Sequence, residues 1–213
     1  MNTISKYKPK NISEFVFPDD QVEAKIKRYV DGKTTEPLIL HGPHGTGKTL
    51  LSELLPNEIE GKKAITTKVN AEDLNNSKEV RGKFNKQVSF DRHFTYNNQK
   101  NRYTVVQEVN FDPKAKGALR VCLDELWEDD IFIFTTNEVR KIDPCVISRA
   151  QVVEVSPAPP KRFFPRAKAI LHAEDVEIDD QMLMKALEAV YENDHDNRAY
   201  YRALDEIIEA AQS

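Results

Sequence analysis

A glycine-rich segment carries the residue types that bind phosphate groups. It reads Gly42-Pro43-His44-Gly45-Thr46-Gly47-Lys48-Thr49 and continues into Leu50. Glycines at this spacing let backbone N–H groups converge on phosphate oxygens, the Lys48 ammonium supplies charge to the outer phosphates, and the Thr49 hydroxyl can bind Mg²⁺. The segment therefore predicts a loop that holds ATP and Mg²⁺, in which His44 is a spacer and not a catalyst.

A second candidate feature is the polar end of the apolar run Tyr103-Thr104-Val105-Val106-Gln107-Glu108-Val109. Glu108 is placed to polarise an attacking water. Gln107 stands where an Asp is expected beside Mg²⁺, and its amide can orient a metal-bound water without adding negative charge. This pattern predicts weak hydrolysis, and the alternative is a buried strand whose polar end is incidental.

Strands and helices alternate around these two features. The loop follows the apolar residues 37–41 and precedes leucines at helical spacing, a helix expected to last until Pro56. Further strands are predicted at residues 64–69, 103–109, 131–136 and 151–155, and further helices at residues 19–32, 78–88 and 113–127. The alternation predicts an α/β fold, a parallel sheet sandwiched by helices with ligands bound at the carboxyl ends of the strands.

The proline-rich residues 156–160 end this alternation. Beyond them only helical periodicity is visible, at residues 170–171, 182–190 and 200–211. We therefore expect two domains, a nucleotide-binding α/β domain at residues 1–156 and a small all-helical lid domain at residues 157–213.

Composition narrows the class of protein. The 213 residues include only two cysteines, Cys122 and Cys145, so neither a disulfide framework nor a zinc module is indicated and a cytoplasmic, reducing setting is expected. The apolar runs are too short to span a bilayer, so no membrane partner is expected. Residues 78–120 hold ten basic and four acidic side chains, whereas residues 173–213 hold three basic and twelve acidic ones. An anionic partner would prefer the middle of the chain, and the alternative is two solvated faces of opposite charge.

The motifs resemble, in order, those of the clamp-loader branch of AAA+ ATPases, the replication factor C small subunits and their phage and archaeal relatives. The opening Lys6-Tyr7-Lys8-Pro9-Lys10, with Ile12 and Glu14-Phe15, is similar to the family's segment that packs around adenine. Val69-Asn70-Ala71-Glu72-Asp73 with Val80-Arg81, and Ala118-Leu119-Arg120, are similar to its second strand and its Ala-Leu-Arg-Arg stretch. The resemblance covers nearly the whole chain.

The resemblance also implies roles for single residues. Tyr7 and Pro9 would contact the nucleotide base. Asn137, in Thr135-Thr136-Asn137, matches the first sensor, which detects the γ-phosphate and positions water. Arg149, in Ser148-Arg149-Ala150, matches an arginine finger that acts in trans on a neighbouring subunit, and Arg198, in Asp196-Asn197-Arg198, matches the second sensor, which reaches the nucleotide.

The family also suggests partners. In clamp loaders, basic helix starts track the DNA backbone, and Arg81, Lys83 and Lys86 lie in the matching helix, although a solvated helix face would look the same. Other AAA+ subunits, a sliding clamp and primer-template DNA are the implied partners. The sequence stops after the lid, before the collar that holds five clamp-loader subunits together, so a collar-held pentamer is not expected of this chain.

The leading hypothesis is thus an ATP-binding AAA+ protein of clamp-loader type that acts in DNA replication or a related DNA transaction, with hydrolysis weakened by Gln107. One alternative is a non-hydrolysing adaptor in which ATP stabilises a protein interface. The other is a remodelling AAA+ protein with a different partner.

Overall fold

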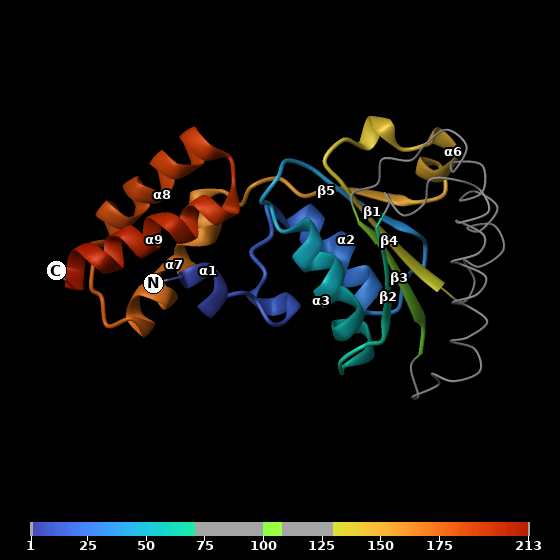
Figure 1. Ribbon diagram of the computed structural model, residues 1–213, viewed down its shortest axis with the longest axis horizontal. Helices are drawn as coiled ribbons and strands as arrows, with labels where there is room; N and C mark the ends of the chain where they lie inside the picture. Colours follow the sequence, from blue (N-terminus) through green and yellow to red (C-terminus); the bar gives the residue numbers. More distant parts are fainter. Residues whose placement is uncertain (1, 71–99, 108–129, 213) are drawn as a thin grey trace. The chain divides into compact units, whose positions relative to one another are not determined.

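The computed structural model describes residues 2–70, 100–107 and 130–212, which form two compact units (Figure 1). One unit, here called the helical unit, contains Met1–Ala24, Pro43–Gly47 and Val155–Ser213. The other, the sheet unit, contains Lys25–Gly42 and Lys48–Glu154. The phosphate-loop segment is thereby divided, because its central residues belong to the helical unit while Gly42 and Lys48 belong to the sheet unit.

The sheet unit is organised around five parallel strands in the order β2-β3-β4-β1-β5. Their bounds are Leu38–His41 for β1, Thr66–Asn70 for β2, Arg102–Gln107 for β3, Asp130–Thr136 for β4 and Gln151–Glu154 for β5. Every residue of the central strand β4 is buried, as is typical of a parallel strand covered on both faces. All carboxyl ends lie at one edge of such a sheet, so the loop after β1 starts beside the ends of β4 and β5.

Paired charges hold the opposite, amino-terminal edge together. Arg102 and Asp130 begin β3 and β4 in register, and the guanidinium contacts the carboxylate twice, at 3.1 and 3.0 Å. Next to them, the Tyr103 hydroxyl donates to Glu60 at 2.7 Å, and the same carboxylate accepts from the backbone N–H groups of Lys100 and Asn101. These contacts fix where the strands start.

The helix after the loop, α3 (Lys48–Glu60), packs against β1, β3 and β4. The sequence-based expectation that it ends at Pro56 is wrong, because the helix continues for one more turn. A proline removes one backbone donor from a helix, and here Pro56 and Ile59 are both buried. Asn57 Nδ2 also donates to the Glu53 carbonyl at 3.2 Å, which stabilises the last turn. Burial and this bond offset the missing donor.

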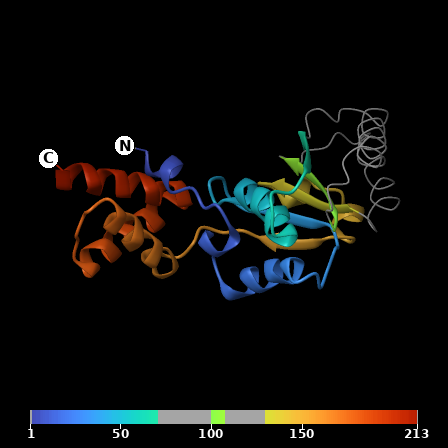
Figure 2. The same cartoon turned by 90° about the horizontal axis from the view of Figure 1, so that it is seen from below.

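Three long helices build most of the helical unit, α7 (Pro160–Ala173), α8 (Asp180–Asp194) and α9 (Asn197–Gln212). Their apolar faces meet in a core in which Phe163 stacks on Tyr200 with ring centroids 4.3 Å apart. The short helix α1 (Thr3–Lys6) lies beside α9 (Figure 2). It is anchored there because Thr3 donates its N–H to Asp205 and its hydroxyl to the Tyr201 carbonyl.

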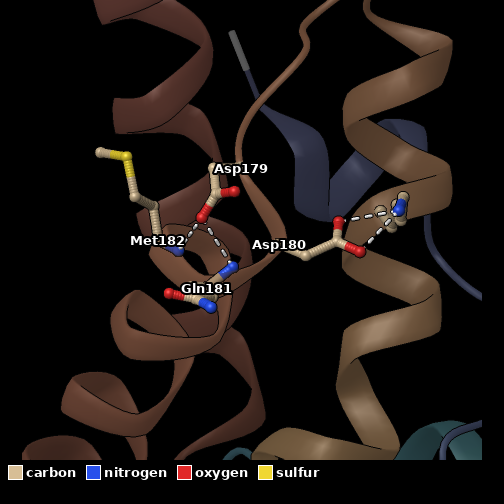
Figure 3. A network of polar contacts seen from close by, with 5 residues as sticks. Asp179, Asp180, Gln181 and Met182 are labelled. Carbon is tan, nitrogen blue, oxygen red and sulfur yellow. Dashed lines mark hydrogen bonds and ion pairs between the residues drawn. The ribbon is translucent and has the colours of Figure 1, made fainter.

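The start of α8 shows how local sequence sets a helix end (Figure 3). The Asp179 carboxylate accepts from the N–H groups of Gln181 and Met182, at 2.9 and 3.1 Å, and so caps the helix. Asp180 forms an ion pair at 2.7 Å with Lys168 of α7. The two neighbouring carboxylates therefore begin α8 and tie it to α7.

The remaining described elements are α2 (Asp20–Val30), α6 (Pro144–Ile147) and two 3₁₀ turns, η1 (Ile12–Glu14) and η3 (Val139–Lys141). No helix in the described ranges is long and apolar enough to cross a bilayer. The predicted fold class, a parallel sheet with helices followed by a helical lid, is confirmed. The predicted helices at residues 78–88 and 113–127 lie outside the described residues.

Candidate functional site

The phosphate loop begins where β1 ends and closes where α3 begins. Lys48, the first residue of α3, is only 8% exposed, and its ammonium donates to the Gly42 carbonyl at 2.9 Å. Pro43, His44 and Thr49 are exposed, whereas Thr46 is fully buried and its hydroxyl donates to the Pro43 carbonyl at 3.1 Å. Lys48 is thus already turned toward its own loop, with Thr49 accessible beside it and Leu50 half-buried.

Two glycines of the loop are required by their surroundings. Gly45 and Gly47 have φ values of +74° and +97°, which side chains rarely tolerate. A Cβ atom on Gly45 would lie 1.8 Å from Asp196 Oδ1, and one on Gly47 would lie 2.8 Å from the Phe15 ring. The loop backbone is therefore packed between the N-terminal segment and the start of α9, all within the helical unit.

The carboxyl ends of the strands bring several polar residues of the sheet unit to one edge. His41 lies between Thr136 of β4 and Glu154 of β5 in the strand register. Gln107 ends β3, directly after the residue that pairs with Phe134 of β4. Asn137 follows β4 and is exposed. The structure thus places Gln107 and Asn137 at the edge where Lys48 is also found, as parallel strands require.

His41 is a titratable residue that ends β1 directly before the loop. Burial lowers the pKa of His41 below its usual 6.5, Glu154 acts in the opposite direction, and Lys48 acts with burial. The imidazole is consequently neutral at pH 7 and does not add positive charge to the loop. Lys48 supplies positive charge there.

The N-terminal segment places Tyr7 and Pro9 in the helical unit, both half-buried. The Tyr7 hydroxyl donates to Glu174 at 2.5 Å, the Lys6 ammonium contacts the same carboxylate at 2.6 Å, and Arg166 holds the Tyr7 carbonyl at 2.6 Å. The hydrogen bonds from Lys6 and Tyr7 lower the pKa of Glu174, and the bond to Glu174 raises the pKa of Tyr7. Tyr7 is thereby anchored to α7 and to the residue that caps it.

Arg149 and Arg198, the two arginines with predicted nucleotide roles, are both exposed. The Arg149 guanidinium donates to the Cys145 carbonyl at 2.9 Å, within the sheet unit. Arg198 lies in the first turn of α9, in the helical unit, and its N–H donates to Asp196 at 2.8 Å. Each belongs to a different unit.

Four predicted site residues lie outside the described ranges. They are Glu108, proposed to orient water, and the basic residues Arg81, Lys83 and Lys86. Their roles stay predictions.

Sequence reasoning missed Phe15, Asp196 and Asn197 as residues that contact the loop. The Asn197 amide donates to the Thr46 carbonyl at 3.1 Å, and Phe15 and Asp196 pack on the two glycines. Asp196 and Asn197 were noticed only as neighbours of Arg198. A polar pair directly before a predicted helix is a signal for a cap, but nothing local indicates that the cap faces a loop 151 positions away in the sequence.

Comparison with known proteins finds similarity to replication factor C small subunits. The chain is 29% identical over 190 residues to replication factor C small subunit 2 of Pyrobaculum arsenaticum, which covers 88% of this chain and 56% of the relative. It is 27% identical over 192 residues to the replication factor C small subunit of Thermofilum pendens, covering 89% of this chain and 57% of the relative. The chain thus spans about half the length of these curated relatives.

Solved structures share the fold at low sequence identity. A RuvB variant from Thermotoga maritima superposes with a TM-score of 0.71 at 14% identity, covering 96% of this chain and 72% of that one. A DNA polymerase III gamma subunit-related protein from the same organism gives a TM-score of 0.57 at 18% identity, covering 87% and 58% of the two chains. These likenesses extend to both units.

The resemblance to the clamp-loader branch is therefore confirmed by sequence similarity along most of the chain. The model of the ATPase family associated with various cellular activities matches residues 38–158, from the first residue of β1 to the segment after β5. This range contains the phosphate loop and the five strands of the described residues. The chain belongs to the AAA family of ATPases.

Proposed function

We propose that this chain binds MgATP as a clamp-loader-type AAA+ subunit in DNA replication or a related DNA transaction. The observation that carries the proposal is the phosphate loop itself, with Lys48 held on the Gly42 carbonyl at 2.9 Å at the carboxyl edge of a parallel sheet. Similarity to replication factor C small subunits supports the clamp-loader part.

The residues present fit a nucleotide phosphate chain and a magnesium ion. Gly45 and Gly47 allow the positive φ values of the loop backbone, and Lys48 is a buried cation of the loop. Thr49 would ligate Mg²⁺ directly, and Gln107 would hold one of its waters through the amide oxygen. When bound, the ion would neutralise charge on the phosphates. Tyr7 and Pro9 would line the base, and Arg198 would approach the phosphates.

The proposed catalytic residues divide between two subunits. Glu108 orients the attacking water and Asn137 positions it in the same site, whereas Arg149 completes the site of a neighbouring AAA+ subunit. The exposed guanidinium of Arg149 is consistent with a role across an interface. Residues 1–156 would form the nucleotide-binding domain and residues 157–213 the lid.

The family's partners extend the proposal. A sliding clamp and primer-template DNA would be the substrates of the assembled machine, and Arg81, Lys83 and Lys86 would contact the DNA backbone without reading its sequence. These contacts would make binding fall steeply as salt rises.

A second function is favoured by Gln107. An amide at the end of β3 contributes no charge near Mg²⁺, so hydrolysis would be slow and the protein would act as a nucleotide-holding adaptor. The two functions differ in turnover and share nucleotide binding.

Steady-state ATP turnover tests the proposal, measured on the purified protein with and without primer-template DNA and a sliding clamp. A clamp-loader subunit hydrolyses ATP faster when both are present, and Arg149→Ala removes this stimulation while ATP affinity stays within about twofold, because the arginine serves another site. Tight ATP binding without stimulated turnover would favour the adaptor. Failure to bind ATP at all would refute both.

A further inference from the structure

The first turn of α9 joins two segments that are distant in the sequence. Asn197 lies at the start of that helix, and its side chain reaches the phosphate loop and the connection between β5 and α7 at once. The Nδ2 group donates to the Thr46 carbonyl at 3.1 Å, and the Oδ1 atom accepts from the Ala158 N–H at 2.8 Å. All three residues belong to the helical unit.

The orientation of this carboxamide is fixed by its partners. The Ala158 N–H can only donate, so it requires the amide oxygen, and the Thr46 carbonyl can only accept, so it requires the amide nitrogen. Thr46 and Ala158 are both fully buried, which keeps water from replacing either contact. A single side chain therefore satisfies one buried backbone acceptor and one buried backbone donor.

The bond to Thr46 also determines the direction of an N–H group in the loop. The peptide between Thr46 and Gly47 is trans and planar, so its N–H points away from its carbonyl. Holding the Thr46 carbonyl on Asn197 turns the Gly47 N–H to the opposite side. Because glycine accepts a wide range of φ, this peptide could rotate easily without such a restraint, and Gly47 already has φ of +97°.

We propose that Asn197 is a positioning residue that holds the Thr46–Gly47 peptide with its N–H turned toward the phosphate-binding side of the loop. The proposal rests on the proposed binding of a nucleoside triphosphate at this loop. Loop N–H groups that converge on phosphate oxygens supply much of the affinity of such a site. If these groups are already oriented before the ligand binds, less conformational entropy is lost on binding.

The same side chain couples the loop to the connection between strand and helix. Ala158 is held on both sides, because its N–H donates to Asn197 and its carbonyl accepts from the Tyr200 hydroxyl at 2.8 Å. Phosphate binding that favours one orientation of the Thr46–Gly47 peptide therefore also favours the bound position of Asn197. By linkage, the position of α9 and the affinity for phosphate affect each other equally.

Three single variants separate positioning from ordinary structural support. Asn197→Ala removes both bonds of the carboxamide. Tyr200→Phe removes the other anchor of Ala158 and leaves the Thr46 bond intact. Asn193→Ala is the matched control, because Asn193 also donates its amide to a backbone carbonyl, that of Ala189 at 2.7 Å, but within α8 and away from the loop.

Calorimetric titration of each variant with MgATP and with inorganic pyrophosphate provides the test, alongside the melting temperature without ligand. We expect Asn197→Ala to weaken both ligands by the same factor, about three- to tenfold, as for the loss of one hydrogen bond. Tyr200→Phe and Asn193→Ala should stay within about twofold of the parent protein, even if Tyr200→Phe melts at a lower temperature. Equal losses of affinity for ATP and pyrophosphate would show that Asn197 affects binding of the phosphate groups and not of the base or ribose.

Two results would contradict these expectations. Unchanged affinity in Asn197→Ala, or an equal loss in Tyr200→Phe, would overturn the positioning role while nucleotide binding stands. If the parent bound neither ligand, the proposed function itself would fail and this inference with it. Should Asn197→Ala not fold, Asn197→Asp retains the acceptor for Ala158 and loses the donor to Thr46. At raised salt, which screens the negative charge of the new carboxylate, Asn197→Asp should bind MgATP at least about three- to tenfold more weakly than the parent protein.

Discussion

The two edges of the sheet are built from the same strands and hold their polar residues differently. At the amino edge, Arg102 and Asp130 bind each other, and the Asp130 side chain is 3% exposed. At the carboxyl edge, Gln107 ends β3, His41 stands between β4 and β5, and the accessible Thr49 follows the loop. The polar groups of the amino edge contact each other, whereas we propose that those of the carboxyl edge contact a ligand.

The difference shows how one fold separates the two tasks. A buried ion pair adds little net stability, but removing one partner is strongly destabilising because the other charge is left buried. Replacing a residue whose proposed partner is a ligand leaves no buried charge without its partner in the protein. Such a replacement should alter binding or turnover and have a small effect on folding. Each edge can therefore be disturbed without the other.

The largest effect on folding is expected from Asp130→Ala. It leaves the Arg102 guanidinium, 17% exposed, without its carboxylate, and such losses cost about 3–5 kcal/mol. Denaturant unfolding measures this free energy. Affinity for MgATP, measured below the melting transition, should stay at the parent level. A loss of affinity in the folded variant would show that the amino edge also serves the ligand.

At the carboxyl edge, Gln107→Asp should change the free energy of unfolding less and act mainly on Mg²⁺ affinity and ATP turnover. The added carboxylate would strengthen the hold on a metal-bound water, and outer-sphere partners of a metal typically change affinity or activity by about ten- to a hundredfold. We expect a tenfold lower Mg²⁺ requirement and faster turnover, measured by metal titration of ATPase activity. If this variant instead slowed an already rapid ATPase, Gln107 would not be a weakened metal partner.

The pH dependence of stability should also differ between the edges, and Glu60 is a titrating group at the amino edge. Burial opposes ionisation of this carboxyl, but the hydrogen bonds from Tyr103, Lys100 and Asn101 outweigh it and lower the pKa of Glu60 below its usual 4.5. A lowered carboxyl pKa stabilises the fold above about 4.5, and that contribution is lost as the pH falls toward the folded-state value. In Glu60→Gln, the melting temperature should fall less between pH 5 and pH 3 than in the parent. An identical decline would show that these hydrogen bonds do not stabilise the ionised Glu60 carboxylate.

The smallest effect is expected from His41 at the carboxyl edge. Because burial lowers the pKa of His41, the unfolded chain takes up a proton first as the pH falls below the usual 6.5, and stability declines from there. His41→Gln should remove a shallow decline that begins near pH 6.5 as the pH falls, seen in melting curves. The contribution of Glu60 is lost only below about pH 4.5, so the decline caused by His41 should begin at the higher pH, and the opposite order would contradict the assignment.

Local patterns predicted the position of the glycine-rich loop and the succession of strands along the chain. Glycine spacing after an apolar run is sufficient to identify the loop, and the apolar run at residues 131–134 indicates a strand. The end of α3 was misplaced because proline is read as a terminator, although burial of Pro56 and Ile59 outweighs one lost donor. Helix α6 was missed despite a local signal, Asp143 capping a helix that begins with Pro144.

Long-range polar contacts could not be predicted. The bond between Asn197 and Thr46 joins residues 151 positions apart, and that between Tyr7 and Glu174 joins residues 167 positions apart. Such contacts depend on how the helices pack, whereas the residue types alone are compatible with exposed caps. The sequence therefore predicted which residues would bind phosphate but not which residues hold the loop in place.

Melting temperature with and without saturating MgATP tests the central claim most directly, measured on the parent, Lys48→Ala and Asp130→Ala. At a ligand concentration about a hundredfold above Kd, the parent should gain roughly 5–10 °C. Lys48→Ala should melt near the unliganded parent and gain nothing, whereas Asp130→Ala should melt on the order of 10 °C lower and keep its gain. A gain retained by Lys48→Ala, or lost in Asp130→Ala, would contradict the division of the sheet into a stabilising edge and a ligand-binding edge.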